Sequence, residues 1–161
     1  MKIYLAGFMS GKLLKETTAW RIKIREHYMM KSWDIIWLDP YNGKDLATIT
    51  GDGLKSSVPS QAIIHRDYMS VEQADVMIVN LNNFNSGRTS TGTICEIAWA
   101  WQMRKPIIMI TDEAQYKEHP FTSYFASAFY PSVDAMLNDK IVDYFYQGIN
   151  NAKYNTEDYQ K

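Results

Sequence analysis

The sequence predicts a single α/β domain with a doubly wound parallel sheet of four to five strands, of the flavodoxin or Rossmann type. Two observations indicate this fold. Short apolar runs alternate along the chain with longer segments whose apolar residues recur near helical spacing. Residues 76–81 are rich in β-branched residues and apolar on both faces, which is typical of a central parallel strand. The length of 161 residues also fits one domain of about 150 residues.

The first part of the chain predicts two strands with a helix between them. Residues 2–6 are a short apolar run that Gly7 stops, which indicates a buried first strand. Residues 13–31 place apolar side chains near helical spacing with charges between them, so a helix is expected there. Residues 34–38 predict the second strand, which ends before Pro40.

The next segment, residues 39–60, contains three Gly, two Pro and several Ser, Thr and Asp residues. A loop of about 20 residues in a compact domain is either functional or a sign of a missed element. Residues 61–73 then predict a helix with Ser60 as its N-cap, followed by the strand 76–81.

The last third of the chain continues the alternation. Polar residues 82–92 indicate a turn before the next helix, and Lys105-Pro106 closes that helix. Residues 150–161 are polar and are expected to be a tail, so that the domain comprises residues 1–149. The expected elements are a helix over 93–104, a strand over 107–110, a short fifth strand over 123–130, and a final helix over 132–145 capped by Ser132.

Composition and charge exclude several classes of function. The chain is 46% hydrophobic, and 17 Lys and Arg against 18 Asp and Glu give a net charge of -1. A protein that binds nucleic acid usually carries a basic excess, and a membrane span needs about 18 consecutive apolar residues. The single Cys95 forms no internal disulfide, which favours a reducing compartment. We therefore expect a cytoplasmic protein that binds neither nucleic acid nor membrane.

In a doubly wound sheet, ligands bind at the carboxyl ends of the strands. Tyr4 lies near that end of the first strand, Asp67 lies on the helix before the third strand, and Glu96 lies in the first turns of the next helix. The N-terminus of a helix stabilises a carboxylate. A solvated helix-start Glu is the alternative, but the apolar surroundings in residues 94–99 favour an anion inside a cleft.

Four segments in a fixed order carry a resemblance to a known family. They are residues 3–7 (IYLAG), residues 66–76 with Arg66-Asp67 and EQADV, residues 90–100 (STGTICEIAWA) and residues 105–107 (KPI). Together they resemble the nucleoside 2-deoxyribosyltransferase family, including related nucleotide N-glycosidases, over residues 2–110.

The resemblance implies roles for particular residues. Glu96 matches the family's nucleophile, which attacks C1′ of the sugar, and Tyr4 matches the Tyr that orients it. Asp67 matches an Asp that contacts the base and helps proton transfer. Ser90 stands where the transferases carry an Asp that holds the sugar 5′-hydroxyl, whereas the relatives that act on 5′-monophosphates have Ser. A carboxylate would repel phosphate, and a hydroxyl donates to it.

A phosphate at the 5′ end would need backbone N–H groups and positive charge, which the loops after the strands offer. The expected substrate-binding residues are Gly7, Ser10, Gly11, Lys12, Arg88, Ser90 and Gly92.

Two carboxyl groups with different pKa values suffice to cleave an N-glycosidic bond, and no metal or other cofactor is required. His27, His65 and His119 are widely scattered, so a metal site is not expected. The segment 7–12 is shorter than a nucleotide-triphosphate loop, and Leu13 stands where such a loop has its Ser or Thr, so an NTPase is disfavoured.

We therefore expect an enzyme that cleaves the N-glycosidic bond of 2′-deoxyribonucleosides or their 5′-monophosphates through Glu96. It would transfer the deoxyribosyl group to another base or to water, as part of nucleotide salvage. A 5′-monophosphate hydrolase, a catalytically silent nucleotide-binding module and a flavin carrier are the alternatives. Its partners would be a nucleoside or nucleotide and a free nucleobase, and the resemblance implies a homo-oligomer in which a neighbouring subunit closes each site.

Overall fold

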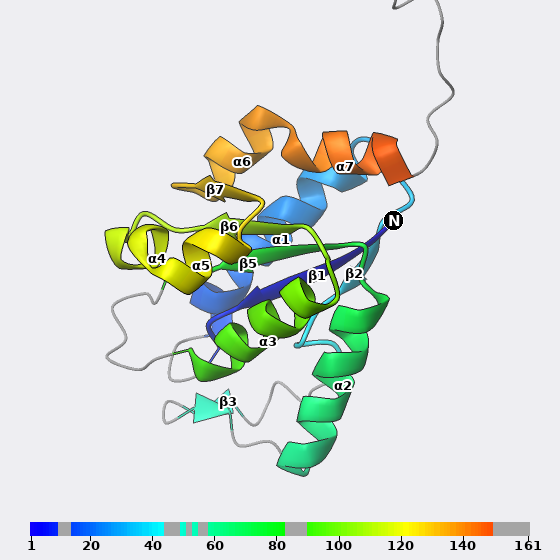
Figure 1. Ribbon diagram of the computed structural model, residues 1–161. Helices are drawn as coiled ribbons and strands as arrows, with labels where there is room; N and C mark the ends of the chain where they lie inside the picture. Colours follow the sequence, from blue (N-terminus) through cyan, green and yellow to red (C-terminus); the bar gives the residue numbers. More distant parts are fainter. Residues whose placement is uncertain (10–13, 44–48, 51–52, 55–57, 83–89, 150–161) are drawn as a thin grey trace, which may run out of the picture.

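The computed structural model describes residues 1–9, 14–43, 49–50, 53–54, 58–82 and 90–149 (Figure 1). Its main sheet has five parallel strands in the order β2-β1-β5-β6-β7. This is the strand order of flavodoxin-like proteins, so the predicted fold class is confirmed. The strands are β1 (Lys2–Gly7), β2 (Ile36–Leu38), β5 (Val76–Asn80), β6 (Ile107–Ile110) and β7 (Ala128–Tyr130).

Helices cover both faces of the sheet (Figure 1). One face packs against α1 (Leu14–Met29), α6 (Val133–Asp139) and α7 (Ile141–Ile149). The opposite face packs against α2 (Ser60–Gln73), α3 (Thr91–Gln102), α4 (Ala114–Glu118) and α5 (Pro120–Phe125). A separate antiparallel pair, β3 (Ile49–Thr50) and β4 (Gly53–Leu54), lies within the long segment after β2.

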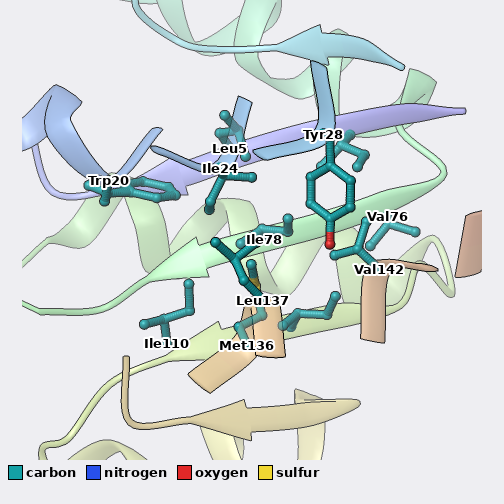
Figure 2. Close-up of a cluster of buried hydrophobic side chains, with 12 residues drawn as sticks. Leu5, Trp20, Ile24, Tyr28, Val76, Ile78, Ile110, Met136, Leu137 and Val142 are labelled. Atoms are coloured by element: carbon teal, nitrogen blue, oxygen red, sulfur yellow. The ribbon is translucent and has the colours of Figure 1, made fainter. Parts of the chain in front are cut away.

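Each face of the sheet has its own hydrophobic core, because side chains of a strand alternate between faces. In β1, Leu5 points into the cluster formed with α1, α6 and α7 (Figure 2). Its neighbours Tyr4 and Ala6 belong to the second cluster, formed with α2 and α3. This alternation places the Tyr4 ring on the same side of the sheet as Glu96 and Asp67.

The strand order reverses at β1. The next strand of the sheet, β2, lies on one side of β1, and β5 lies on its other side. In this fold such a switch point opens the crevice that binds ligands. Gly7 ends β1 there and pairs with Asn80 of β5. A Cβ at Gly7 would lie 2.9 Å from the Asn80 carbonyl oxygen, so close backbone approach requires glycine at this position.

Two predictions about local structure were wrong in part. The short fifth strand expected over residues 123–130 is present as β7, but it comprises only Ala128–Tyr130, because α5 occupies Pro120–Phe125. The His119 side chain accepts from the Phe121 N–H and Pro120 stands at the first helical position, which together start a helix. Ser60 was expected to cap α2, but Pro59 is the N-cap and Ser60 is already helical.

The final helix is two helices rather than one. Lys140 adopts a left-handed conformation with φ of 57° and ends α6, and α7 begins at the next residue. The predicted cap at Ser132 is confirmed, since its side chain accepts from the Ala135 N–H at 3.1 Å. The expected tail at 150–161 lies outside the described residues.

Candidate active site

Tyr4 and Glu96 meet inside the protein. The Tyr4 hydroxyl donates a hydrogen bond of 2.8 Å to Glu96 Oε1. Tyr4 is fully buried, and Glu96 is 8% exposed. Glu96 points at the sheet because it shares the buried face of α3 with Thr93, Ile97 and Ala100, at helical spacing. Glu96 is therefore not the solvated helix-start residue of the alternative interpretation.

The Tyr4 phenol sits among negative charges. Burial raises the pKa of Tyr4 far above its ordinary value, and the charges of Glu96 and Asp67 raise it further. Tyr4 thus stays protonated, and its hydroxyl is fixed as a donor to the carboxylate. The charges of Glu96 and Asp67 thus act on Tyr4 in the same direction.

Asp67 lies on α2 with little exposure, and Arg66 fixes its carboxylate. Arg66 Nη2 lies 2.9 Å from Asp67 Oδ1. The same guanidinium donates to the Pro40 carbonyl at 2.7 Å and to the Asn42 carbonyl at 2.9 Å. Arg66 therefore ties the Asp67 carboxylate to the backbone that follows β2. The motif Arg66-Asp67 did not by itself predict this contact.

Ser90 precedes α3 and is partly buried. Its hydroxyl donates to Thr93 Oγ1 at 2.6 Å, and its carbonyl accepts from the Ile94 N–H. Gly92 lies exposed in the first turn of α3, with open space where a Cβ would be. Ser90 and Gly92 thus flank the start of the helix that carries Glu96. Ser10, Gly11, Lys12 and Arg88 lie outside the described residues.

A buried cluster of charged residues that was not predicted from the sequence lies at the carboxyl ends of β1 and β2. Arg21 of α1 is 1% exposed, and its Nε lies 3.5 Å from Asp39 Oδ1. Arg25 Nη2 lies 2.5 Å from the other oxygen of Asp39. Arg21 Nη2 also donates to the Gly7 carbonyl at 3.4 Å. The periodicity of α1 held a signal, because Arg21 shares its buried face with Thr17, Ile24 and Tyr28.

A pocket of about 450 Å³ lies between α3, α4 and α5. Tyr4, Asp67 and Glu96 do not line it. Its lining is mostly apolar and consists of Ile94, Ile97, Ala98, Gln115, Tyr116, His119, Phe121, Thr122 and Phe125.

Among the described residues, no three His, Cys, Asp or Glu side chains gather closely enough to hold a metal ion. In the same part of the chain, every helix is too short or too polar to cross a membrane.

The arrangement combines a carboxylate held by a phenol with a second carboxylate held by a guanidinium. A carboxylate of this kind can attack a sugar C1′ or stabilise an oxocarbenium-like transition state, and a second carboxyl group can move a proton to the leaving group. The fold and these side chains together define a flavodoxin-like protein whose candidate site comprises the Tyr4–Glu96 pair and the Asp67 carboxylate.

The family follows from comparison of the sequence. The model of the nucleoside 2-deoxyribosyltransferase family matches residues 3–158, and the chain therefore belongs to that family. The family is one of enzymes of the deoxyribosyltransferase and N-glycosidase type. Among curated proteins, no sequence match was found.

Solved structures share the fold. A conserved protein from Enterococcus faecalis V583 is 14% identical, with a TM-score of 0.61, and the match covers 86% of this chain and 95% of that one. The CMP N-glycosidase BcmB of Clostridium botulinum is 19% identical, with a TM-score of 0.53 and coverage of 90% and 99%. BlsM is 18% identical, with a TM-score of 0.61 and coverage of 95% and 96%.

Proposed function

We propose that the protein cleaves the N-glycosidic bond of 2′-deoxyribonucleosides or their 5′-monophosphates, with Glu96 as nucleophile. The observation that carries this proposal is the buried hydrogen bond of 2.8 Å between the Tyr4 hydroxyl and Glu96 Oε1. A carboxylate is seldom buried unless it is paired or takes part in catalysis. In the transfer of a deoxyribosyl group, a nucleophilic carboxylate would attack C1′ of the sugar.

The reaction proceeds in two steps. In the first, the Glu96 oxygen that Tyr4 does not hold bonds to C1′ and the bond from C1′ to the base breaks, while a proton that the Asp67 carboxylate takes up from water when the substrate binds passes to the leaving base. In the second, a nitrogen of another base or a water oxygen bonds to C1′ and releases Glu96, while Asp67 takes the proton of the acceptor. The two outcomes, transfer and hydrolysis, differ only in the acceptor.

The 5′ end of the substrate would lie against the start of α3. Ser90 supports a 5′-monophosphate there, because its neutral hydroxyl can donate to phosphate and brings no negative charge. Ser90 and Thr93 already form one hydroxyl pair at that helix N-terminus, which favours an anion.

A substrate panel tests the activity. The full chain is incubated with each deoxyribonucleoside and each 5′-monophosphate, with and without a free acceptor base, and products are separated by chromatography. We expect release of free base, and a new nucleoside or nucleotide when the acceptor is used. A panel without any base release would overturn the proposed activity and favour a binding module.

Ser90→Asp tests the 5′ end. Two unit charges about 4 Å apart repel by roughly 4 kcal/mol at an effective dielectric of 20, equivalent to several hundredfold in rate. We expect kcat/KM for the monophosphate to fall by about this factor and that for the nucleoside to hold or rise. Thr91→Asp, which places the charge on the neighbouring exposed residue, should have a much smaller effect. A wild type that prefers the nucleoside would contradict the phosphate proposal.

The proposal includes a homo-oligomer. Trp101, Phe121 and Tyr124 are large exposed side chains on neighbouring helices, and Phe125 lies within 4.8 Å of the Trp101 ring centroid. An exposed apolar surface of this kind favours contact with another subunit. Mass photometry of the purified chain is expected to give a multiple of 18.7 kDa, and a monomer would contradict this part.

A further inference from the structure

Arg66 lies between the Asp67 carboxylate and the segment that follows β2. It belongs to α2, and its side chain is 39% exposed. Asp67 and Val71, four residues apart, are the buried residues of α2, and Val71 belongs to the same hydrophobic cluster as Tyr4. Asp67 therefore lies on the face of α2 that packs toward the sheet, and Arg66 lies beside that face.

The contact between Arg66 and Asp67 does not follow from their places on the helix. Consecutive residues of an α-helix point about 100° apart, so their side chains do not normally face each other. Here Arg66 Nη2 and Nε nevertheless lie 2.9 and 3.2 Å from Asp67 Oδ1. Two backbone carbonyls outside the helix hold the guanidinium in this position, because Nη2 also donates to Pro40 at 2.7 Å and Nη1 donates to Asn42 at 2.9 Å.

The turn that carries these two carbonyls is itself fixed. The Asp39 carboxylate accepts from the Tyr41 N–H at 2.9 Å, and the Asp39 carbonyl accepts from the Asn42 N–H at 2.9 Å. Arg25 Nη2 lies 2.5 Å from the same carboxylate, and Arg21 Nε lies 3.5 Å from it. The acceptors of Arg66 are thus held by contacts that reach back to α1.

Arg66 makes the two oxygens of Asp67 unequal. An Arg–carboxylate pair with two parallel hydrogen bonds occupies both oxygens. In this pair Nε and Nη2 both contact Oδ1, and within the described residues every hydrogen bond that Asp67 accepts goes to that oxygen. Oδ2 is therefore the oxygen that is available for a proton and for a bound base.

We propose that Arg66 is a positioning residue for Asp67: its guanidinium, held by the Pro40 and Asn42 carbonyls, fixes Oδ1 and presents Oδ2 to the base of the substrate. This inference rests on the proposed function of Asp67. The proton that passes to the leaving base would then be carried by Oδ2, because Oδ1 already accepts two hydrogen bonds. A carboxylate held in one orientation transfers a proton more readily than one that must first rotate into place.

NMR of the full chain with 15N-labelled arginine tests the contact without any substrate. The Nε–H group is the specific reporter, since Asp67 Oδ1 is its acceptor. We expect the Arg66 signal, assigned with Arg66→Lys, to exchange slowly with water in the wild type and much faster in Asp67→Ala. A wild-type signal that exchanges as fast as that of the exposed Arg104 would overturn the proposal.

A double-mutant cycle tests the role in catalysis. Arg66→Gln should lower kcat about tenfold for substrates with poorly leaving bases, and less for bases that leave easily, because it affects only the proton transfer. In an Asp67→Asn background the same change should lower kcat by less than about twofold, since no proton donor is left to position. An equal loss in both backgrounds would indicate a structural role only and would overturn the proposal, as would an unchanged kcat in Arg66→Gln.

Two further variants sharpen the kinetic test. Arg66→Lys keeps the charge but has no planar fork to hold the carboxylate and both carbonyls, so it should restore little of the lost kcat. Full recovery would mean that charge alone suffices and would contradict the proposal. Lys105→Gln is the matched control and should keep kcat, because Lys105 Nζ also donates to a carbonyl of α2, that of Glu72 at 2.9 Å. A wild type without base release would instead overturn the proposed function, and the NMR signal would still decide whether Arg66 holds Asp67.

Discussion

Tyr4 and Tyr28 are both buried tyrosines, but they lie on opposite faces of the sheet and in different chemical surroundings. Tyr28 stands among rings, with Trp33 stacked at 5.6 Å and Trp37 at 6.3 Å between centroids (Figure 2 shows its place beside Val76 and Val142). Tyr4 instead gives its hydroxyl to a buried carboxylate. Burial raises the pKa of both phenols.

The nearest charges explain the difference. Asp143, which acts on Tyr28, is paired with Lys31 at 2.5 Å, so the negative charge there is balanced. Glu96 has the Tyr4 phenol as its hydrogen-bond donor, and Asp67 adds a second carboxylate nearby. A balanced pair serves packing. Buried titratable groups that perturb one another, as Tyr4 and Glu96 do, are typical of sites where a protein does chemistry.

The largest expected effect comes from Glu96→Gln. This change keeps an acceptor for the Tyr4 hydroxyl and removes the nucleophile. We expect base release to fall at least about a thousandfold, because each 1.36 kcal/mol on the barrier is tenfold in rate. Circular dichroism should show an unchanged fold. The measurement is kcat for a deoxyribonucleoside or its monophosphate.

Glu72→Gln on the exposed side of α2 is the control and should keep full activity. Turnover of Glu96→Gln close to wild type would mean that Glu96 is not the nucleophile. Glu96 beside Tyr4 would then have a packing role only, like Asp143 beside Tyr28.

Asp67→Asn should have the next largest effect, about a hundredfold to a thousandfold, since positioned proton donors contribute in this range. The loss should be greatest for bases that are poor leaving groups, because they need protonation most. A series of substrates with leaving groups of increasing acidity measures it. Asp134→Asn, on the surface where it pairs with Lys23, is the control. Equal losses along the series would contradict the acid role.

Much of this architecture could be predicted from the sequence. The alternation of apolar runs and helical periodicity gave the strands and main helices because burial on both faces of a parallel sheet leaves a strong pattern. The order of motifs predicted Tyr4, Asp67 and Glu96 as site residues, although residues 4 and 96 are far apart in the chain. Only the structure shows that the Tyr4 hydroxyl and Glu96 Oε1 lie 2.8 Å apart.

Arg21 and α5 show why the rest was missed. A charged residue in a helical pattern is normally assigned to the solvated face, yet Arg21 falls on the buried face of α1 with Ile24 and Tyr28. Its burial depends on Asp39 and the Gly7 carbonyl, which are distant in sequence. The aromatic residues of α5 favour a strand locally. The segment is nevertheless helical, because Pro120 at the first helical position favours the start of a helix.

The two tyrosines allow the comparison itself to be tested, with the smallest expected effects. Tyr4→Phe removes one hydrogen bond to Glu96 and leaves both carboxylates in place, so we expect kcat to fall about tenfold, the size of a lost bond to a charged group. Tyr28→Phe should leave kcat unchanged, because no reacting group lies near that ring. Both variants should retain the fold by circular dichroism and thermal unfolding. If the two variants lost activity equally, the distinction between the two buried phenols would fail. A loss in Tyr4→Phe larger than in Glu96→Gln would mean that Tyr4 does more than orient the carboxylate.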